Sequence, residues 1–111
     1  MKKIEAIIRE SQFLKVRDAL KNLGVKHFTY WDVTGVGKEK QPHVYRGVNY
    51  ESSAINRRFI SLVVSEDLLD AAIEALLDSA STNEVGDGKI FVLPVEKSIR
   101  IRTKESGPSS L

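Results

Sequence analysis

The sequence has no cysteine and no long apolar run. Without cysteine the chain forms no disulfide, no zinc–thiolate site and no thiol nucleophile. No stretch approaches the ~18 apolar residues of a membrane span. Its start, Met1-Lys2-Lys3, leads into an alternating segment instead of the apolar core of a signal peptide. These absences favour a cytoplasmic protein that does not insert into a membrane.

The sequence also lacks a large excess of positive or negative charge. Lys and Arg number 17 and Asp and Glu 15, so the net charge is +2, which is too small by itself to indicate a nucleic-acid partner. The two histidines, His27 and His43, have no close cluster of other ligand types, so we expect no metal site. Ser, His and Asp residues show no triad-like spacing, and an enzyme is not favoured.

A chain of 111 residues predicts one domain, residues 1–111. Apolar and β-branched segments predict strands at 2–9, 28–36, 59–64 and 89–92, and a short further strand at 98–102. Two helices are expected, one capped by Ser11 and ended by Gly24, the other capped by Ser65. Their apolar stripes are Val16, Ala19, Leu20 and Leu23, and Leu68, Leu69, Ala72, Ile73, Leu76 and Leu77.

This order of elements predicts an α+β, ferredoxin-like βαββαβ sandwich, with four antiparallel strands and two helices on one face. The other face of the sheet would carry apolar residues such as Ile7 and Val63. An oligomer is the simplest way to cover such a face.

The segment from about 37 to 55 keeps neither a helical nor a strand period, and a loop of this length is usually functional or disordered. Tyr45 and Tyr50 within it suit partner binding or modification, although a disordered connection is the alternative. The tail from Lys104 is expected to be unstructured when alone.

Two features could bind an anion. The turn at 86–89, Gly-Asp-Gly-Lys, can direct several backbone N–H groups into one concavity beside a lysine, although it lacks P-loop spacing and an ordinary Asp-Gly turn is the alternative. Arg100 and Arg102 lie two apart on the expected strand 98–102, so they form either a phosphate clamp or a solvated face. Together they make a phosphate site reasonable.

Four segments resemble the PII nitrogen-regulatory signal proteins. They read MKKIEAII at the start, YRGVNY in the long loop, TNEVGDGKIFVLPV, and SIRIRTKESG near the end. The similarity covers essentially the whole chain in register. It implies a homotrimer that binds ATP or ADP in each cleft between subunits, often senses 2-oxoglutarate, and regulates a transporter or an enzyme without being an enzyme itself.

The resemblance also implies roles for segments and residues. The T-loop (about 37–55) would dock on the partner protein, the B-loop (about 82–89) would hold phosphates, and residues 103–111 form the tail. Tyr50 matches the tyrosine that some members have uridylylated. The expected nucleotide-binding residues are Thr29 and Val63 near the adenine, Gly37 and Lys38 at the T-loop base, Gly86, Asp87, Gly88 and Lys89 in the B-loop, and Arg100 and Arg102 from the neighbouring subunit.

The chain departs from the family pattern at several positions. Glu39 replaces a usual glutamine, and although a carboxylate can hold magnesium it repels 2-oxoglutarate, so weak or absent sensing is expected. Residues 82–84 read Thr-Asn-Glu where Thr-Gly-Lys is common, which predicts a preference for ADP or AMP over ATP, or reduced affinity for all three. The T-loop is one residue shorter than usual and the flanks of Tyr50 differ, so the partner is expected to differ too.

Two alternatives remain open. The chain could be an interaction scaffold that has lost nucleotide sensing. It could also be a slow ATPase in the same cleft, with Glu84 as the only candidate base. Retention of the B-loop glycines, Lys89 and both arginines favours the nucleotide-responsive regulator.

Overall fold

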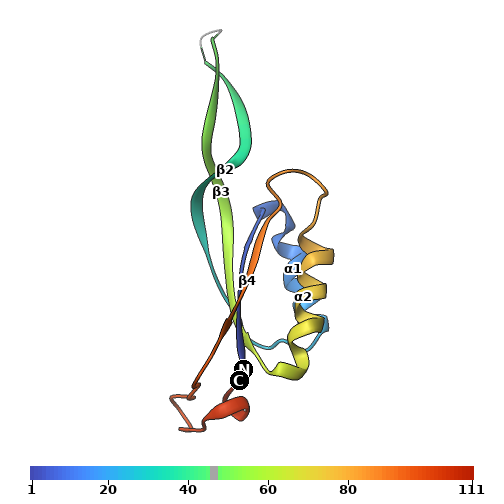
Figure 1. Ribbon diagram of the computed structural model, residues 1–111, viewed down its shortest axis with the longest axis vertical. Coiled ribbons are helices and arrows are strands. Elements are labelled where there is room, and N and C mark those ends of the chain that lie inside the picture. Colours follow the sequence, from blue (N-terminus) through green and yellow to red (C-terminus); the bar gives the residue numbers. More distant parts are fainter. Residues whose placement is uncertain (46–47) are drawn as a thin grey trace.

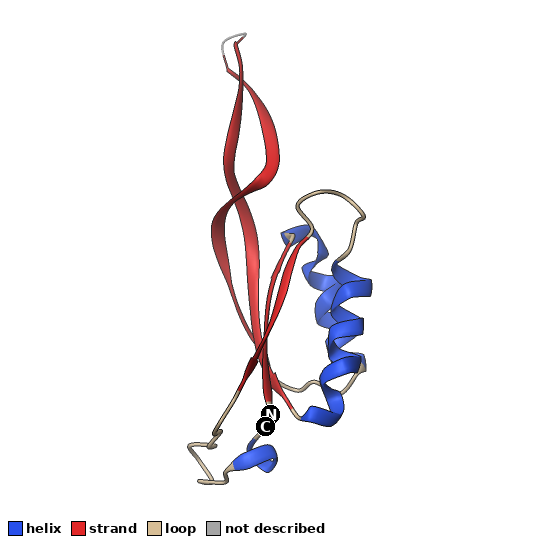
Figure 2. Cartoon of the chain, viewed as in Figure 1, coloured by secondary structure: helices blue, strands red, loops and turns tan. Residues whose placement is uncertain are grey.

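A computed structural model describes residues 1–45 and 48–111, with side chains for 1–37 and 54–111. One antiparallel sheet has the strand order β2-β3-β1-β4, and two helices lie along one face of it (Figure 2). The elements are β1 (Lys2–Ile8), η1 (Glu10–Gln12), α1 (Phe13–Asn22), β2 (Thr29–Tyr45), β3 (Val48–Val64), α2 (Glu66–Ala80), β4 (Gly88–Pro94) and η2 (Gly107–Ser110). The predicted ferredoxin-like α+β fold is confirmed.

The core lies between the sheet and the helices. Alternate residues of β1 and β3 are buried there because successive strand side chains point to opposite faces. The buried apolar set on the strands and helices includes Ile4, Ala6, Ile8, Ile60, Leu62, Val64, Phe13, Val16, Leu20, Ala72 and Leu76. Most of the predicted helical stripes therefore face the core.

Two details of the helices differ from prediction. Leu77 is 51% exposed, because it lies one position past the buried Leu76 and is turned about 100° away around the helix. Ser11 does not cap α1: it lies inside η1, and α1 begins at Phe13 after Gln12. Gly24 does end this helix, with φ at +93° and its N–H bonded to the Lys21 carbonyl at 3.0 Å.

The helix-free face of the sheet is rich in exposed aromatic and aliphatic side chains. The strand register places Trp31, Phe59, Ile7 and Lys89 in one row across the four strands. Trp31 stacks on Phe59 with ring centroids 4.6 Å apart and stays 45% exposed, as does Phe91. The predicted apolar surface is therefore present, and a second surface is needed to bury it.

The expectation of an irregular segment at 37–55 is wrong. β2 and β3 continue beyond the sheet as a two-stranded ribbon, with paired residues as far as Tyr45 and Val48 (Figure 1). A register shift between Val36 and Gln41 marks the base of this ribbon. Apolar alternation is imposed where one strand face is buried against a core, so strands that extend beyond the sheet are not required to carry that period.

The expectations for the C-terminal segment are also wrong. The predicted strand 98–102 is instead part of a tight hairpin that turns at residues 101–103: Ile99 bridges to Ser106, and the Arg100 N–H donates to the Glu105 carbonyl at 2.9 Å. The tail continues into η2, where the Ser110 hydroxyl contacts that of Ser98 at 2.7 Å. Local turn and side-chain hydrogen bonds order this segment without strand pairing to the sheet. Among the described residues, no helix has both the length and the apolar character that a bilayer crossing requires.

Candidate functional site

The B-loop connects α2 to β4 and is organised around one carboxylate. Asp87 accepts hydrogen bonds from the backbone N–H groups of Thr82 (2.8 Å) and Asn83 (3.0 Å) and from the Thr82 hydroxyl. The Arg9 guanidinium donates to it at 3.0 Å. The hydrogen bonds from Thr82, helped by Arg9 and Asn83, hold the pKa of Asp87 well below its usual range. This side chain therefore organises the loop from within as an anion at neutral pH.

Two arginines hold the loop from outside. Arg9, just past β1, donates to the Val85 carbonyl at 2.8 Å. Arg57 of β3 donates through Nε and Nη2 to the Gly86 carbonyl at 3.2 and 3.0 Å. Neither arginine was among the predicted site residues, and their immediate neighbours give no local signal: Arg9 lies between Ile8 and Glu10, and Arg57 between Asn56 and Arg58.

The two glycines of the loop have conformations that other residues rarely adopt. Gly86 and Gly88 have φ values of +97° and +112°. Lys89 follows at the start of β4, opposite Ile7 in the register, and its side chain is exposed. A cleft of about 330 Å³ lies here, lined by Asp87, Gly88 and Lys89 together with residues of β1 and α2. This end of the chain offers backbone dipoles and one cation to an anionic ligand.

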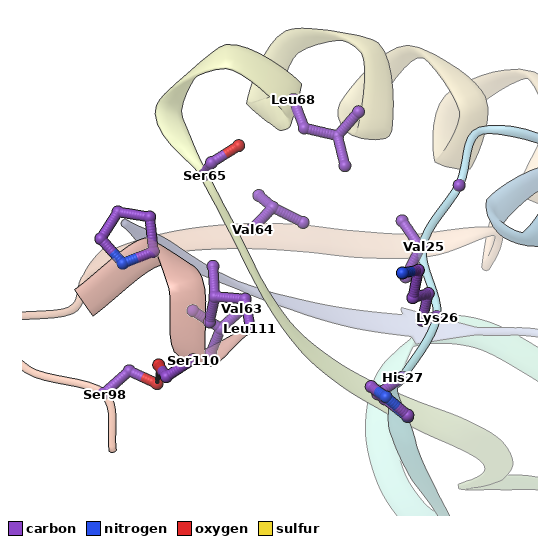
Figure 3. Close-up of a pocket in the computed structure, with 12 residues that line it drawn as sticks. Val25, Lys26, His27, Val63, Val64, Ser65, Leu68, Ser98, Ser110 and Leu111 are labelled. Atoms are coloured by element: carbon purple, nitrogen blue, oxygen red, sulfur yellow. Dashed lines mark hydrogen bonds between the residues drawn. The ribbon is translucent and has the colours of Figure 1, made fainter. Parts of the chain in front are cut away.

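The predicted adenine contacts lie toward the other end of the sheet. Val63 lines a cavity of about 400 Å³. Lys26 and His27 lie on one side of that cavity and Ser98 and Ser110 on the other (Figure 3). Thr29 pairs with Ser61, so it shares the helix-free face with Val63.

Arg100 and Arg102 lie beyond this same end. The Arg100 Nη2 donates to the Leu111 carbonyl at 3.1 Å, and its Nη1 lies 3.6 Å from a Glu105 carboxylate oxygen. Arg102 is exposed in the hairpin turn. They do not extend from one strand face as predicted, because the segment turns at residues 101–103.

Within one chain the predicted phosphate contacts are not brought together. Lys89 opens β4 and the arginines follow its end, and the strand Gly88–Pro94 has 7 residues, a length of about 20 Å. Gly37 lies on β2 at the ribbon base, and a Cβ there would be 3.9 Å from Ile55. The side chains of Lys38, Glu39 and Tyr50 lie outside the described residues.

The chain thus combines a ferredoxin-like sheet, a projecting two-stranded ribbon and a glycine loop held by two arginines. A family model described as Nitrogen regulatory protein P-II matches residues 1–105. Nitrogen regulatory protein P-II of Cereibacter sphaeroides is 40% identical over 112 residues, and that of Azospirillum brasilense is 41% identical, each alignment covering 100% of both chains. The structure of GlnK from B. subtilis matches with a TM-score of 0.83 at 32% identity, covering 99% of this chain and 97% of that one.

The chain therefore belongs to the nitrogen regulatory protein P-II family. Proteins of this family are regulatory signal proteins and not enzymes. They generally bind adenine nucleotides, form trimers and interact with protein partners.

Proposed function

We propose that this chain is a cytoplasmic, adenine-nucleotide-responsive signal protein whose binding site is completed between two copies. The observation that supports the proposal is the position of the two features predicted to bind an anion, at opposite ends of β4. The B-loop and Lys89 lie at the start of the strand, and Arg100 and Arg102 follow its end. A phosphate chain contacted by both must therefore lie between different subunits.

Such a site joins unlike ends of two copies and is therefore a heterologous contact. Repeated heterologous contacts form a ring when the rotation from one copy to the next closes on itself. A homotrimer is the ring that membership in the family supports. The exposed Trp31, Phe91 and neighbouring side chains of the helix-free face supply apolar surface for its interior. In this arrangement one subunit contributes the B-loop, Gly37 and Lys38. The next contributes Thr29, Val63, Arg100 and Arg102.

The B-loop sequence favours ADP or AMP over ATP. Glu84 is exposed on the loop, and its negative charge opposes a third phosphate more than a second one. Magnesium could accompany ATP, with Glu39 as a further ligand. The same carboxylate would repel 2-oxoglutarate, and tight synergistic binding of that acid with Mg-ATP in calorimetry would contradict this part of the proposal.

The output surface is the T-loop ribbon, which extends beyond the rest of the subunit (Figure 1). A two-stranded projection presents backbone and side chains to a partner at a distance from the nucleotide. We propose that the partner is a transporter or a cytosolic enzyme, and that Tyr50 is a candidate for modification.

Thermal-shift measurements with AMP, ADP, ATP and 2-oxoglutarate test the nucleotide part. Wild-type protein should be stabilised by a nucleotide, by about 2.7 kcal/mol at 100 times its Kd, and Lys89→Ala should lose most of that gain. Lys21→Ala, an exposed change on α1, serves as the matched control. If no adenine nucleotide stabilises the wild type while partner binding persists, the alternative of a non-sensing scaffold is correct.

A further inference from the structure

Arg57 is the one charged side chain that is buried among the side chains described, with 8% exposure. Burying a guanidinium is costly unless its donors are satisfied. Here they are directed at backbone carbonyls: Nη1 donates to Asn56 at 2.8 Å, and Nε and Nη2 both donate to Gly86. The paired bonds to one B-loop carbonyl are the feature to be explained.

These bonds fix the orientation of one peptide group in the loop. The described residues contain no cis peptide bond, and in a trans peptide the C=O and N–H point in opposite directions. With its carbonyl held by Arg57, the Gly86–Asp87 peptide turns its N–H to the opposite side. An anion that accepts a hydrogen bond from this N–H would polarise the peptide group. The hydrogen bonds from Arg57 to the Gly86 carbonyl would then become stronger, because linked hydrogen bonds reinforce one another.

Arg57 belongs to the strand that forms the ribbon. β3 runs without interruption from Val48, in the ribbon, to Val64, in the sheet, and Arg57 pairs with Val33 of β2 just below the ribbon base. We propose that Arg57 is a positioning residue that transmits B-loop occupancy to the ribbon. The inference rests on the proposed nucleotide site and adds the physical link between that site and the docking surface.

Its neighbour Arg58 provides a matched control. Arg58 points to the opposite face of β3, where it stacks over Phe13 with 4.6 Å from its guanidinium carbon to the ring centroid. It also pairs with Asp32 at 2.9 Å. The two adjacent arginines thus have the same chemistry and the same strand, but only Arg57 is bonded to Gly86.

The test compares wild type, Arg57→Lys and Arg58→Lys at saturating ADP. Lysine keeps the charge but lacks the planar fork whose Nε–H and Nη2–H both donate to the one Gly86 oxygen. Hydrogen exchange of amides 37–45 and 48–55 is measured with and without ADP. We expect ADP to change exchange about fivefold or more in wild type and Arg58→Lys, and to change it little in Arg57→Lys although calorimetry still shows ADP bound. An equal response in Arg57→Lys, or no response in wild type that binds ADP, would overturn the inference.

A second measurement needs no variant. The Nε–H resonance of Arg57 should shift on addition of ADP while that of Arg58 stays in place, and an unmoved Arg57 resonance in ADP-bound protein would also overturn the inference. If calorimetry shows that wild type binds no adenine nucleotide, the proposed function fails, and the coupling fails with it. The two failures are therefore distinguishable.

Discussion

Gly88 lies against the carbonyl of Ile7 where β4 meets β1. A Cβ at Gly88 would be 1.7 Å from the Ile7 oxygen and 2.8 Å from its carbonyl carbon. Because Gly88 is paired with Ile8 in the strand register, neither strand can move away without loss of pairing. Glycine is therefore required here by packing as well as by its φ of +112°.

Gly88→Ala should lower the free energy of unfolding by about 3 kcal/mol or more, because a backbone clash adds to the conformational strain. Gly24 supplies the comparison, since its φ is also positive but nothing lies within 4 Å of its would-be Cβ. Gly24→Ala should cost only about 1 kcal/mol. Urea denaturation at one protein concentration measures both, and equal losses would show that the contact with Ile7 is unimportant.

Asp87→Asn should destabilise the protein at neutral pH and lose that effect in acid. The folded-state pKa of Asp87 is lowered, chiefly by Thr82. A carboxyl with a lowered pKa stabilises the fold above its unfolded value of about 3.9 and loses that contribution as pH falls through the folded value. The stability difference between wild type and Asp87→Asn should therefore be constant from about pH 8 to 5 and shrink below about pH 4.

Thermal unfolding of both proteins across that range makes the measurement. Asp70→Asn, on an exposed position of α2, controls for the general loss of a negative charge. A difference that grows in acid would mean that Asp87 does not stabilise the B-loop as an anion.

The sheet and its core were predictable because one buried face imposes alternation on β1 and β3. The ribbon was not, since strands outside the core carry no such signal. The glycine turn was recognised by composition, but the role of its aspartate was not, because the partners of Asp87 include Arg9, which is 78 positions away in the chain. The role of Arg57 could not be predicted for the same reason: its hydrogen bond to Gly86 spans 29 positions, and no local sequence pattern indicates such a contact.

Glu84→Lys should raise the affinity for ATP more than that for ADP. A cation on the exposed loop attracts the terminal phosphate, and near a protein surface this amounts to about three- to tenfold in Kd. Glu74→Lys makes the same charge change at an exposed position on α2, away from both ends of β4. Calorimetry with both nucleotides at low salt makes the comparison. An equal gain in ATP affinity for the two variants would show that net charge, and not the position of Glu84 on the loop, causes the effect.

Mixing two defective subunits tests whether the site is shared between copies. Lys89→Ala and Arg102→Ala should each bind ADP poorly as pure proteins, because each lacks a cation that contacts phosphate. When the two are co-expressed in equal amounts, an interface can take Lys89 from one subunit and Arg102 from the other. Half of the B-loops and half of the hairpins are intact, so about a quarter of the interfaces of a closed ring regain both cations.

Calorimetry should then find a fraction of sites near one quarter with wild-type affinity. Co-expression of Lys89→Ala with the double variant Lys89→Ala/Arg102→Ala is the control, since no interface in that mixture has Lys89. Restoration in the first mixture and not in the second can arise only if each site draws on two chains. Failure of the first mixture to regain any tight site would mean that the separation of Lys89 and Arg102 along β4 is not bridged by a second subunit.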